Sequence, residues 1–405
     1  MRLRGSTRSC GSSAMHDLIE FSKLVEINPQ TVVTGRIAPF VGMEDVSEDG
    51  RLLNIRRRSV GDLSGGLSVF RDDDVLFAKI TPCMENGKGA HVAGLESNAG
   101  LGSTEFHVLR ARRNVVPRYI YHWTQSKRFR RAAEAMMAGS AGHRRVPVEF
   151  FHRYLIPRFT FAEQQQIVEI LDAVDVRLAA TAAALTKQQA LANGVISHLL
   201  SPPDGKATEG WEVRPVNRVG EVQIGRQLSP SQLNGRHMRP YLRVANVHDG
   251  YVDYSDVLEM NFTPAEFATF SIERGDVLLN EGQSLELVGR SALYDGPPGM
   301  CFQNTLIRFR PRHVLPTVAR AIFKRWLDTG EFMKIALQTT SIAHLGSERF
   351  AAMPFVLPPM AEQQRIAETV DALEGEERAM RNEQHRLVLL RQGLMEDLLG
   401  GRVRV

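Results

Sequence analysis

Residues 163–200 read EQQQIVEILDAVDVRLAATAAALTKQQALANGVISHLL, and residues 362–399 read EQQRIAETVDALEGEERAMRNEQHRLVLLRQGLMEDLL. The two stretches align without a gap at a constant offset of 199 residues, and each is preceded by alanine, so that AEQQ opens both copies. A repeat of this length indicates one large unit used twice, in contrast to a short-period solenoid.

Both copies are predicted to be long helices. In the first copy, apolar residues alternate at spacings of three and four, with only Thr181 and Gln188 interrupting the seam: Leu171, Val174, Leu178, Leu185, Ala192, Val195 and Leu199. This pattern is typical of a helix that packs lengthwise on a partner helix. The second copy places Glu377, Gln384 and Arg391 in its seam, so we expect it to need a partner.

The ends of the first helix are also marked. Thr160 followed by Glu163 suits a capping box, and Ser201-Pro202-Pro203 stops the helix because proline lacks the amide hydrogen. Each helix would be about 57 Å long. No other element in the chain combines this length with an apolar seam, so we expect the two helices to form an antiparallel pair. Two interpretations remain open here: a structural or oligomerising coiled coil, and a rigid spacer between two globular domains.

The length of 405 residues and a hydrophobic content of 43% suit two globular domains plus the helices. The predicted fold class is α+β, with two globular α/β domains separated by two long helices that form an antiparallel coiled coil, in a pseudo-two-fold tandem repeat. The predicted segments are a flexible tail at 1–16, globular domains at 17–158 and 204–357, and helices at 159–203 and 358–405. Met15 is an alternative start.

Bulk features exclude several classes of protein. No apolar run approaches eighteen residues, so we expect no membrane span. Cys10, Cys83 and Cys301 are too scattered for a disulfide framework or a metal site, which favours a reducing cytoplasm. The net charge is +4, and only eight of the 50 basic residues are lysine. A GC-rich genome would produce this arginine bias, but arginine also contacts phosphate and guanine.

The globular halves repeat one order of elements. Short apolar runs predict strands at 67–70, 75–80 and 106–109, followed by helical spacing over 117–137. In the second half we expect a strand at 241–247, and further mirrored runs predict equivalents of the first half: Gly275–Leu279 mirrors Asp73–Phe77, Leu306–Arg308 mirrors Val108–Arg110, and Pro316 starts a helix as Pro117 does. Asp73 stands at the position where the second half has Gly275. We expect the turn to form in the first half as well, because aspartate tolerates left-handed geometry.

A search for chemistry predicts no catalytic residue, no metal site and no cofactor. The segment Glu85–Gly89 is interpreted as a turn and not as a phosphate loop. A nuclease centre could use Asp72-Asp73-Asp74 with Lys79. However, strand alternation would put Asp72 and Asp74 on one face, and no acid stands two residues before Lys79.

Arginine and amide residues gather where loops are expected. These clusters are Arg56–Arg58, His143–Arg145, Gly225–Gln227 and Arg236–Arg243. Arginine can clamp guanine and an amide can clamp adenine, while generic basic charge anchors phosphates. Each cluster taken alone also fits a solvated surface.

Taken together, the layout resembles the specificity (S) subunit of type I restriction-modification enzymes. The resemblance rests on VEINPQ, VLFAKITPCMENGKG, YLRVANV followed by GDVLLNEG, and the paired AEQQ helices that close in LL, and it covers the chain from about residue 17. It implies two target-recognition domains that each read half of a split duplex DNA sequence, with helices that set the gap and dock methyltransferase (M) subunits. In that family the M subunits carry S-adenosylmethionine, the restriction (R) subunits carry cleavage, and the S subunit is not an enzyme.

We expect DNA contacts from polar residues at loops or strand ends, several of them within or beside these phrases: Lys79, Arg144, Arg145, Arg226, Gln227, Arg243, Asn246, Gln283 and Arg290. Lys79 and Asn246 could equally be structural. The alternative functions are a scaffold without DNA specificity and, less favoured, a nuclease or methyltransferase with an unfamiliar site. Salt dependence separates them, because DNA binding weakens steeply with salt.

Overall fold

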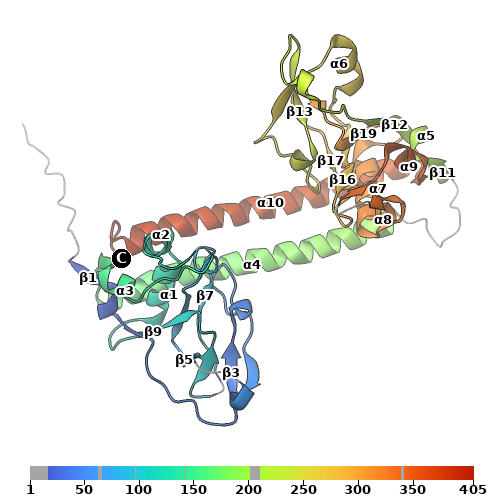
Figure 1. Cartoon of the computed structure of the whole chain (residues 1–405). Helices are drawn as coiled ribbons and strands as arrows, with labels where there is room; N and C mark the ends of the chain where they lie inside the picture. The colour runs from blue at the N-terminus through green and yellow to red at the C-terminus, as the bar shows by residue number, and fades with distance from the viewer. Residues whose placement is uncertain (1–16, 63–65, 96, 141, 201–209, 339–341) are drawn as a thin grey trace, which may run out of the picture. The chain divides into compact units, whose positions relative to one another are not determined.

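The structure is a computed structural model that describes residues 17–62, 66–95, 97–140, 142–200, 210–338 and 342–405. The predicted N-terminal tail, the Ser201–Pro203 stop and Cys10 lie outside these residues. The chain divides into two compact units: unit 1 comprises residues 1–182 and 382–405, and unit 2 comprises residues 183–381. Each unit holds a globular part and one half of each long helix (Figure 1).

Unit 1 builds two four-stranded sheets. The helix-side sheet, in the order β2-β9-β6-β7, is antiparallel, and the far sheet has the order β4-β3-β8-β5 with β3 and β8 parallel. The elements are β1 (Leu18–Glu20), β2 (Val25–Ile27), β3 (Ile37–Val41), β4 (Arg56–Ser59), β5 (Ser68–Phe70), β6 (Val75–Ala78), β7 (Gly89–His91), β8 (Gly100–Gly102), β9 (Phe106–Ala111), α1 (Pro117–Gln125), α2 (Lys127–Ala135), α3 (Glu149–Arg153) and β10 (Leu155–Pro157). β1 and β10 pair with each other as a separate antiparallel ladder.

Unit 2 repeats this plan. Its helix-side sheet is β12-β19-β15-β17, and its far sheet is β14-β13-β18 with β13 and β18 parallel. The elements are β11 (Glu212–Pro215), α5 (Val216–Val219), β12 (Gly220–Ile224), β13 (Met238–Leu242), β14 (Leu258–Asn261), α6 (Pro264–Phe270), β15 (Val277–Asn280), β16 (Gly282–Gln283), β17 (Ser291–Leu293), β18 (Cys301–Phe302), β19 (Leu306–Pro311), α7 (Pro316–Asp328), α8 (Glu331–Ile335), β20 (Leu337–Gln338), β21 (Ala343–His344), α9 (Ser347–Ala352) and β22 (Pro354–Leu357).

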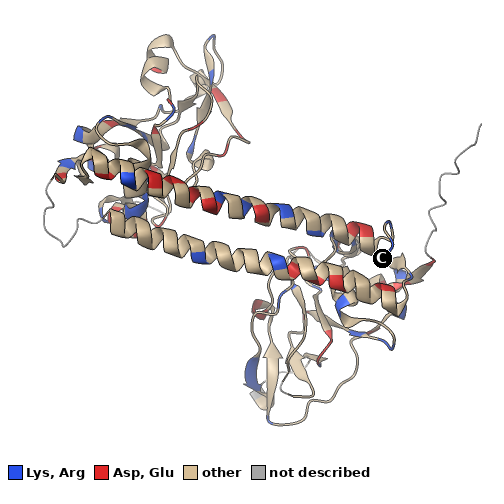
Figure 2. Ribbon diagram, turned by 180° about the vertical axis from the view of Figure 1, so that it is seen from behind, with Lys and Arg blue, Asp and Glu red and all other residues tan. Residues whose placement is uncertain are grey.

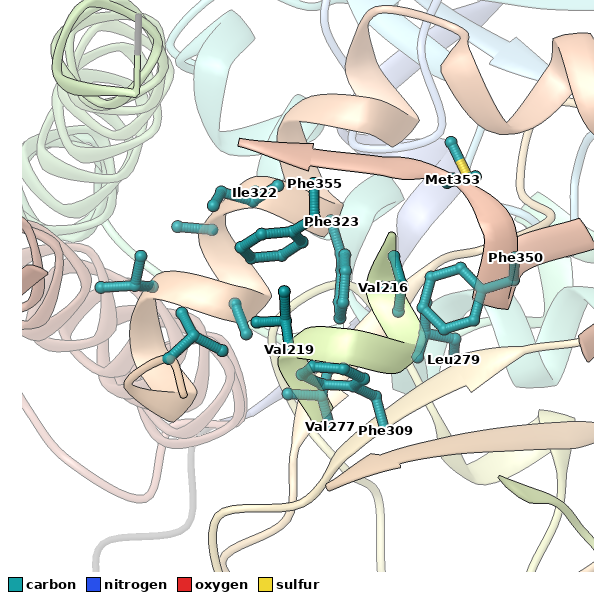
Figure 3. Packing of buried hydrophobic residues seen from close by; sticks show 14 of the residues in the cluster. Val216, Val219, Val277, Leu279, Phe309, Ile322, Phe323, Phe350, Met353 and Phe355 are labelled. Atoms are coloured by element: carbon teal, nitrogen blue, oxygen red, sulfur yellow. The ribbon is translucent and has the colours of Figure 1, made fainter. Parts of the chain in front are cut away.

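Each unit has its main core between the helix-side sheet and the helices. In unit 2, Phe309 of β19 and Phe323 of α7 meet edge to face, with ring centroids 5.1 Å apart, and Phe350 packs on Phe323 at 5.2 Å (Figure 3). In unit 1, Phe77 and Phe129 make the same kind of contact at 5.7 Å. Both cores extend to the long helices, through Ile167 in unit 1 and Ile366 in unit 2.

The two long helices are present as predicted: α4 spans Phe161–Leu199 and α10 spans Met360–Leu399. The predicted capping box forms, since the Thr160 amide donates to Glu163 at 2.7 Å and the Glu163 amide donates to the Thr160 hydroxyl at 3.3 Å. Every residue of both predicted seams is buried or half-buried, whereas exposed charges of both signs alternate along α10 (Figure 2). In the part of the chain that the structure describes, no helix is long and apolar enough to cross a membrane.

Within each unit the helix halves run antiparallel. In unit 1, Arg391 pairs with Asp175, and Arg177 pairs with Glu383. In unit 2, Gln189 donates to Glu377 at 2.8 Å. Glu377 and Arg391, which interrupt the second seam, therefore have partners on α4, which explains why the seam tolerates them.

Two predicted elements are wrong in extent. The expected strand over 241–247 ends at Leu242, because the Asn246 side chain accepts a hydrogen bond from the Arg243 amide and folds the chain into a 3-10 turn at Val244–Asn246. The expected single helix over 117–137 is two helices. Ser126 is extended and its hydroxyl accepts from the Phe129 amide, so that it ends α1 and caps α2.

The turn before β6 forms as predicted. Asp73 adopts φ of 68° and its counterpart Gly275 adopts 95°, so both occupy the left-handed region. However, Asp72 and Asp73 lie in a turn, and not in the strand that the nuclease hypothesis assumed. Asp74 is buried and accepts two hydrogen bonds from Arg110. This carboxylate already has a charged partner and is not part of an open acidic cluster.

Candidate nucleic-acid interface

An arginine-aspartate pair beside this turn recurs in both units. Arg110 of β9 donates to both oxygens of Asp74 at 2.7 and 2.8 Å, and Arg310 of β19 does the same to Asp276 at 2.8 Å. Each aspartate is almost fully buried. Because paired, buried charges of this geometry hold two strands in one register, the ends of β6 and β15 are set in the same way in the two units.

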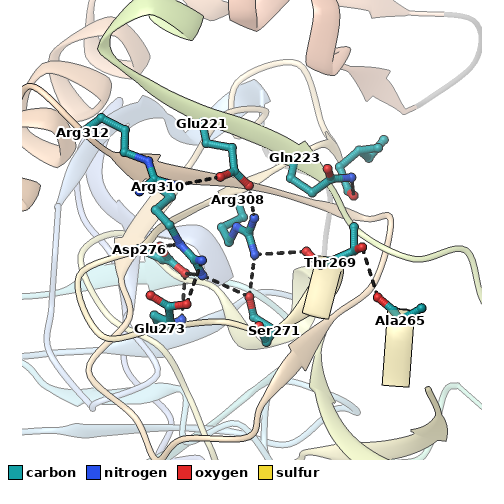
Figure 4. A network of polar contacts seen from close by, with 11 residues as sticks. Glu221, Gln223, Ala265, Thr269, Ser271, Glu273, Asp276, Arg308, Arg310 and Arg312 are labelled. Atoms are coloured by element: carbon teal, nitrogen blue, oxygen red, sulfur yellow. Dashed lines mark hydrogen bonds and ion pairs between the residues drawn. The ribbon is translucent and has the colours of Figure 1, made fainter. Parts of the chain in front are cut away.

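Unit 2 adds a further buried arginine to this network (Figure 4). Arg308 is 2% exposed, donates to Glu221 of β12, and also donates to the carbonyl oxygens of Thr269 and Ser271 at the end of α6. Burial lowers the pKa of Arg308, and the carboxylate of Glu221 opposes that shift. The counterpart in unit 1 is Val108, and not Arg110 as the mirrored runs predicted, because Phe309 pairs with Val277 as Leu109 pairs with Val75. Arg308 therefore fastens α6 of unit 2 to β12 and β19, whereas the 3-10 turn Val60–Asp62 follows β4 in unit 1.

A glutamine of the AEQQ sequence joins each globular part to its long helix. Gln164 accepts from the Val116 amide at 3.0 Å and donates to the Phe159 carbonyl at 3.2 Å. Gln363 accepts from the Leu315 amide at 2.8 Å and donates to the Pro358 carbonyl at 2.9 Å. All three positions differ by 199 residues between the units. The contact explains why this short sequence recurs.

A cluster of His122, Asp172 and Asp175 has the residue types of a metal site. However, Arg118 pairs with Asp172, and Arg391 pairs with Asp175, so arginines balance both carboxylates. Burial would raise the pKa of Asp172, but hydrogen bonds from His122 and Arg118 outweigh it and hold that pKa well below its usual range. The cluster fastens α1 to α4 and needs no ion to balance its charge.

The loops at the carboxyl ends of β6 and β15 form the candidate interface, which we call the corner of each unit. In unit 1 the Lys79 amide donates to the Glu105 carbonyl at 2.9 Å, and the Val146 amide donates to the Lys79 carbonyl at 2.9 Å. In unit 2 the same two bonds are made by Glu281 with Thr305 at 2.9 Å and by Leu345 with Glu281 at 2.8 Å. The corners of the two units thus share these two backbone hydrogen bonds.

The side chains of the two corners differ in charge. In unit 1, Lys79 lies beside Glu105, which pairs with Arg145 at 2.7 Å, and burial lowers the pKa of Lys79. In unit 2 the counterparts are Glu281, Thr305 and His344, and His344 lies 2.9 Å from Glu281. One backbone frame therefore presents a lysine and an arginine in the first half, and a glutamate and a histidine in the second.

Several of the predicted contact residues lie in or next to these corners. The structure brings Lys79 and Arg145 together, and Arg144 lies next to them, 3.4 Å from Glu85. Gln283 of β16 pairs in the ladder with Ala343, so it lies in the corner of unit 2, and Arg290 belongs to the loop that returns to β15 through a hydrogen bond with Asn280. Sequence reasoning missed Glu105, Glu281 and His344. Glu281 lies 202 residues after Lys79 and His344 lies 199 residues after Arg145, so comparison of the two halves could have identified these two.

The remaining predicted residues lie on the far-sheet side of unit 2. Arg226 pairs with Glu266 of α6, Gln227 is exposed, and Arg243 pairs with Asp256. Asn246 is 2% exposed and donates to the carbonyl oxygens of Asp253 and Asp256 at 3.0 and 2.9 Å. Its amide closes a loop, as Asp45 does through the Gly42 amide in unit 1. DNA contact by these residues stays a prediction.

Comparisons with known proteins agree with this architecture. A family model described as the type I restriction modification DNA specificity domain matches residues 208–386. The specificity subunit of the type I restriction enzyme EcoEI of Escherichia coli is 37% identical over 155 residues, which is 37% of this chain and 26% of that subunit. The EcoKI specificity subunit of Escherichia coli (strain K12) is 25% identical over 289 residues, which is 66% of this chain and 60% of that subunit. The chain thus spans about a quarter of the length of the EcoEI subunit that it matches.

Solved structures extend the likeness of the fold to the whole chain. A structure described under complex assembly and conformational transition of the type I R-M system aligns with a TM-score of 0.62 and 19% identity, over 96% of this chain and 99% of that one. The type I S subunit of M. genitalium aligns with a TM-score of 0.55 and 14% identity, over 97% and 98%. The family model thus identifies residues 208–386 as a type I restriction modification DNA specificity domain, and the solved structures show that the whole chain shares their fold.

Proposed function

We propose that this chain is the non-catalytic DNA-recognition subunit of a type I restriction-modification complex that acts in the cytoplasm. Residues 17–158 and 204–357 would each read one half of a split duplex target. The paired helices would set the gap between the halves and dock M subunits, and R subunits would join the complex for cleavage.

One observation carries the proposal: the two corners share a backbone and differ in their side chains. Base edges are recognised by hydrogen-bond groups on a rigid frame, and the identity of the side chains selects the base. Lys79 and Arg145 offer donors, which suit the O6 and N7 acceptors of guanine. Glu281 offers an acceptor, which suits the amino group of cytosine. The two units would therefore read different half-targets with side chains held by the same backbone arrangement.

The test exchanges one corner while leaving the other unchanged. The triple variant Lys79→Glu, Glu105→Thr, Arg145→His would give unit 1 the side chains of unit 2. Each variant would be co-expressed with its M subunit, and methylated bases would be mapped across the host genome by single-molecule sequencing. We expect a split motif in which only one half changes. The reciprocal triple variant, Glu281→Lys, Thr305→Glu, His344→Arg, is the matched control and should change only the other half.

The result that would refute the proposal is a methylation motif that stays the same in both triple variants while the complexes remain active. Loss of all methylation would be checked by co-purification with the M subunit. An intact complex without methylation would support the corner as part of DNA binding, because the M subunit would be present but not directed to a site.

A further inference from the structure

The far sheet of each unit has an outer face, turned away from the helix-side sheet, with a small apolar cluster of its own. In unit 1 this cluster contains Ala38, Phe40 and Leu101. In unit 2 it contains Tyr241, Met260 and Cys301, with Phe267 of α6 packed against it. The other face of each far sheet packs into a separate core. The outer faces are not used by the corners described above.

In unit 1 an exposed arginine lies across this outer face. Arg58 of β4 pairs in the ladder with Ala38 of β3, and residues that pair directly point to the same side of a sheet. Its guanidinium carbon lies 4.8 Å from the ring centre of Phe40. The arginine-rich strand β4 lies at the edge of this sheet and is visible in Figure 2 as the blue strand of unit 1.

In unit 2 a different strand supplies an arginine at the same place. Arg239 of β13 pairs in the ladder with Met260 of β14, and its guanidinium carbon lies 4.9 Å from the ring centre of Phe267. Arg239 is also exposed. A cation held over an aromatic ring is attracted by the ring. Because the side chain is already held in place, it loses less conformational entropy when it binds a ligand.

The two arginines occupy the same rung of the far sheet on opposite strands. Ala38 stands two residues before Phe40, which pairs with Leu101 of β8, and Arg239 stands two residues before Tyr241, which pairs with Cys301 of β18. Duplication alone would leave the arginine on the same strand in both units. Each unit therefore holds an arginine over an aromatic ring at this rung, although the strand and the ring differ between the units. This recurrence indicates that a cation at this position has a function.

We propose that Arg58 and Arg239 are a pair of phosphate contacts, one in each unit, that anchor the backbone of the duplex beside each half-target. The inference rests on the proposed function and names two of its contacts. A guanidinium held over a ring of its own unit stays at the level of the protein surface, where phosphates approach. A side chain that reads bases has to project into the groove. The expected ligand is therefore phosphate and not guanine.

The test measures the salt dependence of binding by the full-length chain. A fluorescent duplex of mixed sequence is titrated at several salt concentrations with the wild type, Arg58→Gln, Arg239→Gln and the double variant. Each lost phosphate contact lowers the slope of log K against log salt by about 0.9, so the double variant should lose about 1.8. Arg58→Lys and Arg239→Lys keep the charge and should restore the slope.

Neighbouring arginines provide the controls. Arg57 follows Arg56 on β4 and its side chain points to the other face, because side chains alternate along a strand. Arg274 of unit 2 donates to the Asp295 carbonyl at 3.2 Å, in the turn before β15. Arg57→Gln and Arg274→Gln should keep the slope of the wild type, and urea midpoints would establish that each variant is folded.

The outcomes separate the two proposals. A wild-type chain that binds with a slope unchanged in the double variant would overturn the phosphate contacts and leave the DNA-recognition role standing. An equal loss in Arg57→Gln would overturn the assignment to the outer face. A wild type that binds no duplex at any salt concentration would overturn both proposals.

Discussion

Replacing the glutamine that joins each globular part to its long helix should destabilise that unit strongly. In Gln164→Leu, the side chain keeps about the same volume but loses both polar atoms. The Val116 amide, now bonded to Gln164 at 3.0 Å, would lose this partner, and the Phe159 carbonyl would lose the bond that it accepts at 3.2 Å. Gln164 is 3% exposed, so water cannot easily replace it.

The magnitude follows from the unpaired amide and the second lost hydrogen bond. A buried donor without a partner costs about 1–3 kcal/mol and a lost hydrogen bond about 0.5–1.5 kcal/mol, so the variant should lose about 2–4 kcal/mol of the free energy of unfolding of unit 1. Gln363→Leu should cost unit 2 a similar amount, because the Leu315 amide and the Pro358 carbonyl lose the same kind of bond.

Urea unfolding followed by tryptophan fluorescence measures this loss. Trp123 is 2% exposed and reports on unit 1, whereas Trp211 and Trp326 pack on the core of unit 2. The matched control is the next residue of the same sequence: Gln165 is exposed, and Gln165→Leu should change stability by less than about 0.5 kcal/mol. Equal effects of Gln164→Leu and Gln165→Leu would refute the reasoning, because burial and bonding distinguish the two glutamines.

Two further predictions concern buried charge. Burial lowers the pKa of His107 to about 4. Between about pH 6.5 and 4 the unfolded state therefore binds a proton that the folded state does not bind. The free energy of unfolding of unit 1 should fall by up to about 3 kcal/mol over that range. Urea midpoints at pH 7 and 4.5 should show a smaller fall in His107→Gln than in the wild type, and equal falls would contradict this account. Asp276→Asn should cost about 3–5 kcal/mol, because it leaves the charge of Arg310 without its buried partner. Glu273→Gln, which removes an exposed partner of the same arginine, should cost less than about 1 kcal/mol in the same assay.

The long helices could be predicted because their information is periodic and local. A seam repeated over thirty-eight residues identifies the buried face of a helix, and every predicted seam residue is indeed buried or half-buried. The left-handed turn at Asp73 was also accessible, because its counterpart is Gly275 and the conformation depends on one residue. The break of the 117–137 segment at Ser126 was not predicted, since a serine can cap a helix or sit within one until packing decides between them.

The sequence by itself determined the repeat, the long helices, the order of several strands along each half and the absence of a recognisable catalytic motif, because these follow from patterns along the chain. Only the tertiary structure decided which residues share a site. Lys79, Glu105 and Arg145 come from three separate segments, and hydrogen bonds between β6, β9 and the loop before α3 bring them together. The arginines at equal rungs of the far sheets lie on different strands, so no constant offset links them and only the ladder register reveals the match.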